Sequence, residues 1–167
     1  MYKLIIFLIS LLFISESCKM SYSFTGASIS PDVKTIYIRE FANNAPLIMP
    51  TLSQTATETL KDKFVSQTSL QLVDSDGDLN IEGEIISYQT MPMAIQGNDA
   101  AAVNRLTITV KIKFINVTDE KQNFDTSFSR YADYESSKSL DQVEDELIKQ
   151  ILVEINEDIF NKTVANW

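Results

Sequence analysis

The chain has 167 residues, of which 44% are hydrophobic and only four are glycine and four proline, which fits one globular domain of ordinary size. It has no histidine and a single cysteine, so it lacks the usual general base at neutral pH and cannot form an internal disulfide. The formal net charge of -9 argues against binding to nucleic acid by bulk charge, and we expect no nucleic-acid partner.

Residues 1–17 have the features of a secretory signal peptide. Lys3 precedes an apolar run over residues 4–14 that is too short to span a bilayer as a mature helix. The segment ends at Cys18, which is the arrangement of bacterial lipoprotein precursors. We therefore predict that Cys18 carries a diacylglycerol and an N-acyl chain, that these anchor the chain to a membrane, and that no other cofactor is present. An ordinary cleaved signal with an unmodified thiol is the alternative, because residues 15–17 depart from the usual lipobox.

Residues 18–34 are rich in serine and show no sustained periodicity, so we interpret them as a lipidated tether. Residues 35–41 are β-branched and aromatic in character, which predicts a strand. From residue 51 to about residue 67 apolar residues recur at every fourth position, which predicts an amphipathic helix. Thr51 and Gln54 have the spacing of a capping box at its start.

The next segment predicts two strands joined by a tight turn. The apolar residues 70–73 meet the acidic, glycine-containing run 74–78, and a strand over 79–88 follows. The acidic run resembles the start of a calcium loop, but a calcium loop would need a glycine where Leu79 stands. We therefore expect a polar turn and no metal site, and we interpret 91–103 as a long connection.

The strictest pattern in the chain lies between residues 105 and 117. Apolar residues alternate there with Thr107, Thr109, Lys111 and Lys113, which predicts a strand with one buried and one wet face. Residues 124–134 predict its hairpin partner. An apolar stripe from Leu140 to about residue 162, with Ser139 and Gln142 at capping-box spacing, predicts a long final helix.

These elements predict an α+β fold in a single domain over residues 35–167. Each helix has one apolar stripe and each strand one apolar face, so both types of element bury their apolar side chains by stacking. The expected architecture is a two-layer α/β sandwich, with two helices on one face of a mixed, mainly antiparallel sheet of about four to five strands. The other sheet face is left for solvent or for a partner.

No constellation of catalytic residues is visible. Glu82 and Glu84 lie on the same face of a strand, as a pair of acid and base groups would, but no nucleophile motif or phosphate-binding loop accompanies them. We interpret them as residues of the solvent face and expect no enzymatic activity.

Charge is segregated along the chain. The stretch from Asp99 to Asp119 contains Arg105, Lys111 and Lys113 and no acidic residue between its ends, whereas the final helix is strongly acidic. A basic strip on the open sheet face, with Arg130 beside it, would meet phosphates or carboxylates of a ligand or a partner. The alternative is an ordinary solvated face, whose lysines protect the sheet from aggregation.

Several segments, in their order and spacing, resemble the LptE-like family of lipopolysaccharide-assembly lipoproteins over nearly the whole mature chain. They are CKMSYSFTGASI, TIYIREFANNAP, DGDLNIEGEIISY, the arginine-led NRLTITVKIKF and EDIFNKTVANW. The resemblance implies a non-enzymatic lipoprotein, held by its acylated cysteine at the periplasmic face of the outer membrane. It implies two partners, an LptD-like β-barrel whose lumen the protein plugs, and the lipopolysaccharide that the barrel inserts at the cell surface. A free-standing periplasmic lipoprotein that binds lipid or assists a transporter, through an apolar cleft between helices and sheet, is the alternative.

Overall fold

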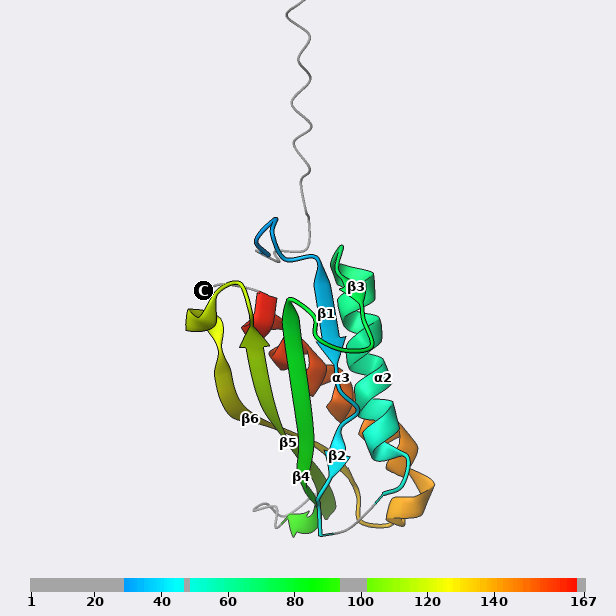
Figure 1. Cartoon of the computed structure of the whole chain (residues 1–167). Helices are drawn as coiled ribbons and strands as arrows, with labels where there is room; N and C mark the ends of the chain where they lie inside the picture. The colour runs from blue at the N-terminus through cyan, green and yellow to red at the C-terminus, as the bar shows by residue number, and fades with distance from the viewer. Residues whose placement is uncertain (1–28, 47–48, 94–101, 165–167) are drawn as a thin grey trace, which may run out of the picture.

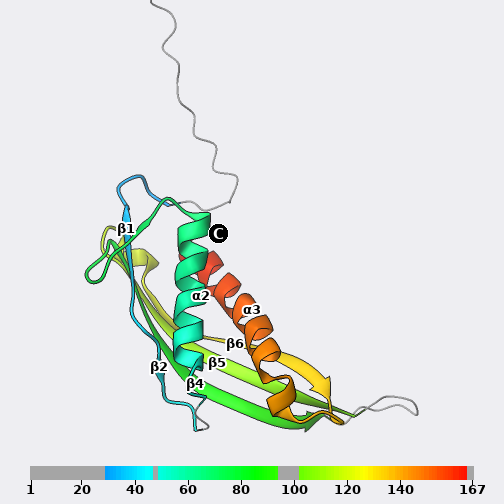
Figure 2. The ribbon, with the colours of Figure 1, turned by 90° about the vertical axis from the view of Figure 1, so that its right-hand side faces the viewer.

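The computed structural model describes residues 29–46, 49–93 and 102–164. The predicted signal peptide and Cys18 lie outside them. The described residues form two layers, a six-stranded sheet and two helices that both lie on the same face of it (Figures 1 and 2). The predicted α+β sandwich is confirmed, with a slightly larger sheet than expected. Among the described residues no helix is both long enough and apolar enough to cross a bilayer.

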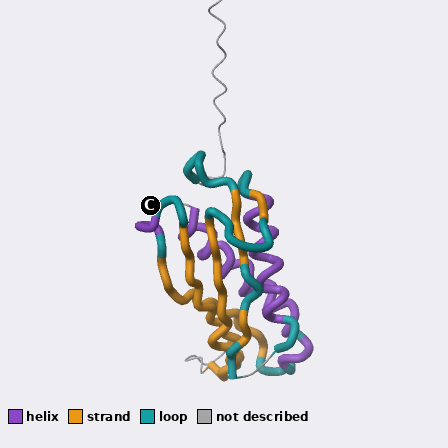
Figure 3. Tube along the Cα trace, in the orientation of Figure 1, coloured by secondary structure: helices purple, strands orange, loops and turns teal. Residues whose placement is uncertain are grey.

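The elements in chain order are close to those that the sequence predicts (Figure 3). The strands are β1 (Thr35–Ile38), β2 (Ala42–Asn43), β3 (Gln71–Leu72), β4 (Leu79–Met93), β5 (Val103–Asn116) and β6 (Phe124–Glu135). The helices are α2 (Leu52–Gln67) and α3 (Glu144–Val164), with 3-10 turns η1 (Glu120–Gln122) and η2 (Leu140–Gln142). The sheet order is β3-β1-β4-β5-β6, and β2 pairs with β4 beyond the end of β1.

The three long strands form an antiparallel meander that provides the floor of the core. Alternate side chains of β5 face the helices and are at most 1% exposed: Leu106, Ile108, Val110, Ile112 and Phe114. The predicted alternation and the predicted β5–β6 hairpin are therefore confirmed. Strand β4 runs on to Met93, so part of the predicted connection over 91–103 belongs to the β4–β5 ladder.

The two helices cover this floor and contact each other. The rings of Phe64 on α2 and Phe160 on α3 contact each other in a tilted arrangement with centroids 5.2 Å apart, and both are almost fully buried. The capping box predicted at Thr51 is wrong, because Thr51 has helical backbone angles and its side chain caps nothing. Before α3, the backbone N–H of Ser139 does donate to Oε1 of Gln142 at 3.1 Å, but this cap closes the turn η2.

The predicted hairpin of β3 and β4 is also wrong. Strand β1 lies between them and is parallel to both, so residues 73–78 must cross β1. They cross on the face opposite the helices (Figures 1 and 2). Gly77 permits the crossing, because a Cβ there would lie 2.7 Å from the backbone nitrogen of Tyr37. The next residue, Asp78, accepts hydrogen bonds from the backbone N–H groups of Lys34 and Thr35 and so fixes the chain where it enters β1.

Candidate functional site

The candidate site is the face of the sheet that neither helix covers, called here the helix-free face. Because alternate residues of β5 face the helices, the residues between them point the other way: Arg105, Thr107, Thr109, Lys111 and Lys113. Three of the four predicted contact residues, Arg105, Lys111 and Lys113, therefore share one face, as the sequence analysis expected.

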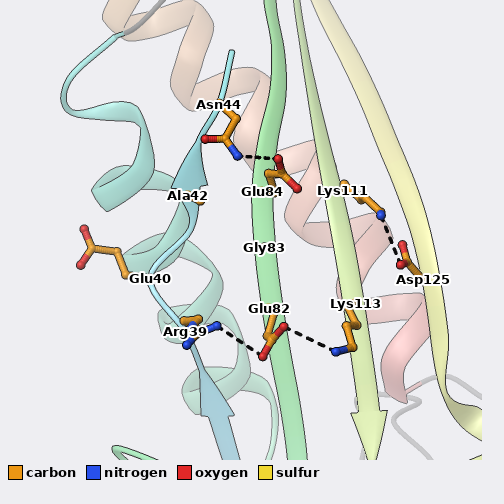
Figure 4. A pocket seen from close by; sticks show the side chains of 10 residues that line it. All are labelled: Arg39, Glu40, Ala42, Asn44, Glu82, Gly83, Glu84, Lys111, Lys113 and Asp125. Carbon is orange, nitrogen blue, oxygen red and sulfur yellow. Dashed lines mark hydrogen bonds and ion pairs between the residues drawn. The ribbon is translucent and has the colours of Figure 1, made fainter.

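The cations of the predicted basic strip are paired within the chain, because acidic residues of the neighbouring strands lie close to the lysines. Nζ of Lys111 lies 3.2 Å from Asp125 of β6, and Nζ of Lys113 lies 3.7 Å from Glu82 of β4. Glu82 also contacts Arg39 at 3.5 Å, so one carboxylate bridges two cations (Figure 4). These pairs follow from the sheet register, in which Glu82 and Asp125 stand on either side of Lys113.

These side chains line a polar hollow at the end of the helix-free face where β1 runs into β2 (Figure 4). It carries charged side chains of both signs: Arg39, Glu40, Glu82, Glu84, Lys111, Lys113 and Asp125. Glu84 accepts a hydrogen bond from Nδ2 of Asn44, and Glu82 is ion-paired. Both carboxylates are thus engaged in cross-strand contacts, which agrees with their interpretation as solvent-face residues. No group of three His, Cys, Asp or Glu side chains suited to a metal ion occurs in the described part of the chain.

Arg105 lies toward the other end of the same face and is held from two sides. Its Nε and Nη2 donate to the two carboxylate oxygens of Asp133 at 2.7 and 2.8 Å, and its guanidinium lies 3.6 Å from the ring centroid of Tyr131. The bidentate contact lowers the pKa of Asp133 and raises that of Arg105. Met91 of β4 stands directly opposite Arg105 in the ladder.

Arg130, the fourth predicted contact residue, does not lie on the helix-free face. It pairs in register with the inward-facing Ile108 and donates to both carboxylate oxygens of Asp158 on α3 at 2.7 Å. Its placement beside the basic strip is therefore corrected. The sequence could have shown this placement. Alternate residues of a strand share a face, and Arg130 is two residues from the half-buried Phe128, so both lie on the helix side of β6.

Sequence reasoning also missed Met91 and Tyr131. These side chains remain 57% and 51% exposed, and each lies next to Arg105 on the helix-free face. Met91 falls in a segment that the sequence analysis interpreted as a connection, so its strand position was not apparent. Tyr131 falls in a predicted strand, and only the pairing with β5 shows that it adjoins Arg105.

Comparisons with known proteins agree with this architecture. The family model described as "LptE: Lipopolysaccharide-assembly" matches residues 33–163, which is well over half of the chain. No protein with a curated description matches the sequence.

Solved structures with a similar fold come from several bacteria. A hypothetical protein from Chlamydia trachomatis has a TM-score of 0.56 at 8% identity, over 80% of this chain and 99% of its own. A protein from Xanthomonas campestris has a TM-score of 0.53 at 10% identity, over 83% and 90% of the two chains. A minor lipoprotein from Acinetobacter baumannii has a TM-score of 0.51 at 14% identity, over 78% and 92%. At these identities the likeness establishes the fold, whereas the family match rests on the sequence itself. The chain therefore belongs to the LptE family of lipopolysaccharide-assembly proteins.

Proposed function

We propose that this protein is a lipid-anchored subunit of a lipopolysaccharide translocon, and that it occupies the lumen of an LptD-like β-barrel in the outer membrane. In this proposal the acylated Cys18 holds the protein at the periplasmic face of the membrane. The domain acts through its shape and surface and catalyses no reaction. Membership of the LptE family supports the role in lipopolysaccharide assembly. The barrel partner is the more specific part of the proposal.

The observation that carries the proposal is the polarity of the helix-free face. The lumen of a large outer-membrane barrel is polar and wet, so a plug must present a surface that tolerates such a wall. On this face the cations Arg105, Lys111 and Lys113 are each paired with a carboxylate within the chain. A wall can cover such a face without leaving these cations buried and isolated, which would be costly.

A free-standing lipid carrier would instead need an apolar cleft between the helices and the sheet. In the described residues this space is filled by close-packed side chains, each at most 1% exposed, including Leu60, Phe64, Ile151 and Ile155. An acyl chain would have to displace several of them. The packing therefore favours the plug over the lipid carrier.

The proposal includes direct contact with lipopolysaccharide through Arg105, Lys111, Lys113 or Arg130. Such contact requires that an existing ion pair be broken. A phosphate would have to replace Asp133, Asp125, Glu82 or Asp158 as the acceptor. We therefore assign the face first to a protein partner, and lipopolysaccharide contact to the assembled complex.

The test is to isolate the protein from outer membranes solubilised in mild detergent, in its native host. The proposal expects a stoichiometric β-barrel of much larger mass to copurify, and mass spectrometry to find the acyl modification on Cys18. A Cys18→Ser variant should lose the modification and enter the aqueous phase when the detergent is phase-separated. A lone monomer carrying bound lipid would contradict the plug and support the lipid carrier.

A further inference from the structure

One cluster on the helix-free face combines exposure with rigidity. Met91, Arg105 and Asp133 form one row across β4, β5 and β6, because Met91 pairs with Arg105 and Arg105 with Asp133. Tyr131 lies two residues before Asp133 on the same face and stacks against the Arg105 guanidinium. We call these four residues the Arg105 cluster.

Three members of the cluster, Arg105, Asp133 and Tyr131, are held in place before any partner arrives, and Met91 lies beside them on the strand opposite Arg105. Arg105 is fixed by two parallel hydrogen bonds to Asp133, and the guanidinium in turn covers one side of the Tyr131 ring. Side chains that are already immobilised lose little conformational entropy on binding, so exposed area in such a cluster contributes more to affinity than area on mobile side chains. Tyrosine, arginine and methionine are also enriched in protein interfaces, and tyrosine and arginine at their energetic centres.

Other exposed apolar side chains lack these features. Val65 of α2 and Val153 of α3 are 52% and 65% exposed on the opposite side of the molecule, on helix surfaces that also carry Glu58, Asp62, Glu154 and Glu157. No comparable stacking or bidentate contact of Val65 or Val153 occurs in the described residues. Single exposed apolar residues of this kind are common on protein surfaces. Val65 and Val153 therefore serve as matched controls in the experiments below.

The charge of the helix-free face indicates what kind of partner fits it. Along β4, β5 and β6 this face carries three cations, Arg105, Lys111 and Lys113, against five anions, Glu82, Glu84, Asp125, Asp133 and Glu135. A surface with this excess of carboxylates disfavours anionic headgroups and phosphates, and it complements a neutral or basic protein surface.

The position of the cluster points in the same direction. Met91 lies twelve residues along β4 from Leu79, the residue of β4 that pairs with the start of β1. At about 3.3 Å per residue this is roughly 40 Å along the strand from the end where the N-terminal arm enters the domain. The cluster and the N-terminal arm thus lie at opposite ends of the sheet, which leaves the cluster unobstructed by the arm and open to a protein wall.

We infer that the Arg105 cluster is the docking point of this protein on the inner wall of its barrel, and that the wall presents neutral or basic side chains there. This inference rests on the proposed function and adds to it the surface that makes the contact. The helix-covered side of the molecule is then not the principal contact.

Photo-cross-linking in native outer membranes tests the inference directly. A photoreactive phenylalanine analogue is placed at position 91 or 131 on the helix-free face, and at position 65 or 153 on the helices as controls. The inference expects positions 91 and 131 to cross-link to the copurified barrel and the two controls to give at most weak adducts. Cross-links from positions 65 and 153 alone, from no position although the barrel copurifies, or from 91 and 131 to a protein other than the barrel would each overturn it.

Paired substitutions give a second measurement that does not depend on the probe. Met91→Ser with Tyr131→Ser should lower recovery of the barrel about tenfold, as expected for the loss of an interface centre. Val65→Ser with Val153→Ser should leave recovery unchanged, and circular dichroism should show both variants folded. Equal recovery from both variants would overturn the inference while leaving the proposed function standing. Failure of the wild-type protein to recover a barrel would remove both.

Discussion

The hydroxyl of Tyr88 donates a hydrogen bond to the carboxylate of Glu144, which ties the middle of β4 to the first turn of α3. Tyr88 is 2% exposed, and its ring belongs to the core. Burial, and then the hydrogen bond to Glu144, raise the pKa of Tyr88 well above its usual value. The contact positions the start of the long helix over the sheet.

Replacing Tyr88 with phenylalanine should therefore lower the free energy of unfolding by about 1.5–3 kcal/mol, the range for a hydrogen bond to a charged group. The pH dependence should change as well. Since the folded-state pKa is raised, the unfolded chain ionises first above about pH 10, and wild-type stability falls as the pH rises further. Urea titrations at pH 8 and pH 10.5 should show a smaller loss in Tyr88→Phe than in the wild type. Tyr37→Phe is the control, and an equal alkaline loss in Tyr88→Phe would refute this account.

The entry of the chain into β1 should be sensitive to acid. The Asp78 carboxylate accepts from the N–H of Lys34 at 2.8 Å and from the N–H and hydroxyl of Thr35 at 2.9 and 2.8 Å. These bonds lower the pKa of Asp78, so its contribution is present above about pH 4 and is lost as the pH falls through the lower folded-state pKa. Asp78→Asn should be less stable than the wild type at pH 7, and the difference should shrink toward pH 2. Asp74→Asn, in the exposed part of the same loop, should show no such trend when acid unfolding is followed by fluorescence.

Gly83 should tolerate no side chain. A Cβ there would lie 2.3–2.5 Å from ring carbons of Phe41, which packs against β4 and is 2% exposed. Gly83→Ala should therefore cost about 1–3 kcal/mol of stability through overpacking. The clash is with one ring, and Phe41→Leu removes that ring. Phe41→Leu should therefore lower the free energy of unfolding less in the Gly83→Ala background than in the wild type. Additive costs in a double-mutant cycle would show that the strain lies elsewhere.

Replacing Asn156 with an apolar residue should stabilise the protein. Asn156 is 3% exposed, its Nδ2 donates to the Thr59 hydroxyl at 2.8 Å, and its buried Oδ1 has no hydrogen-bond partner among the residues that the structure describes. An unpaired buried acceptor costs about 1–3 kcal/mol, so Asn156→Leu should raise the free energy of unfolding by about 1 kcal/mol. The Thr59 hydroxyl keeps its bond to the Thr55 carbonyl at 2.7 Å. Chemical denaturation measures the effect, with the exposed Asn161→Leu as the control; a less stable Asn156→Leu would show that the amide is satisfied in solution.

The sequence by itself determined the elements and their stacking. The alternation of β5 and the three- and four-residue spacing of α2 and α3 are local patterns, and each specifies which side chains are apolar together. Elements with a single apolar face have few ways to bury it, so the two-layer arrangement followed from them. The absence of histidine and of a catalytic motif, and the family resemblance, were likewise properties of the chain alone.

Only the tertiary structure decided which residues stand opposite one another. The insertion of β1 between β3 and β4, the carboxylates facing Lys111 and Lys113, and the clamp on Arg105 all depend on strand order and register. Register is set by contacts between segments remote in sequence, and a shift of one residue would exchange the two faces of a strand. Local periodicity carries no information on that choice, so the sequence predicted a basic strip on the open face but not the carboxylates that pair with it or the clamp on Arg105.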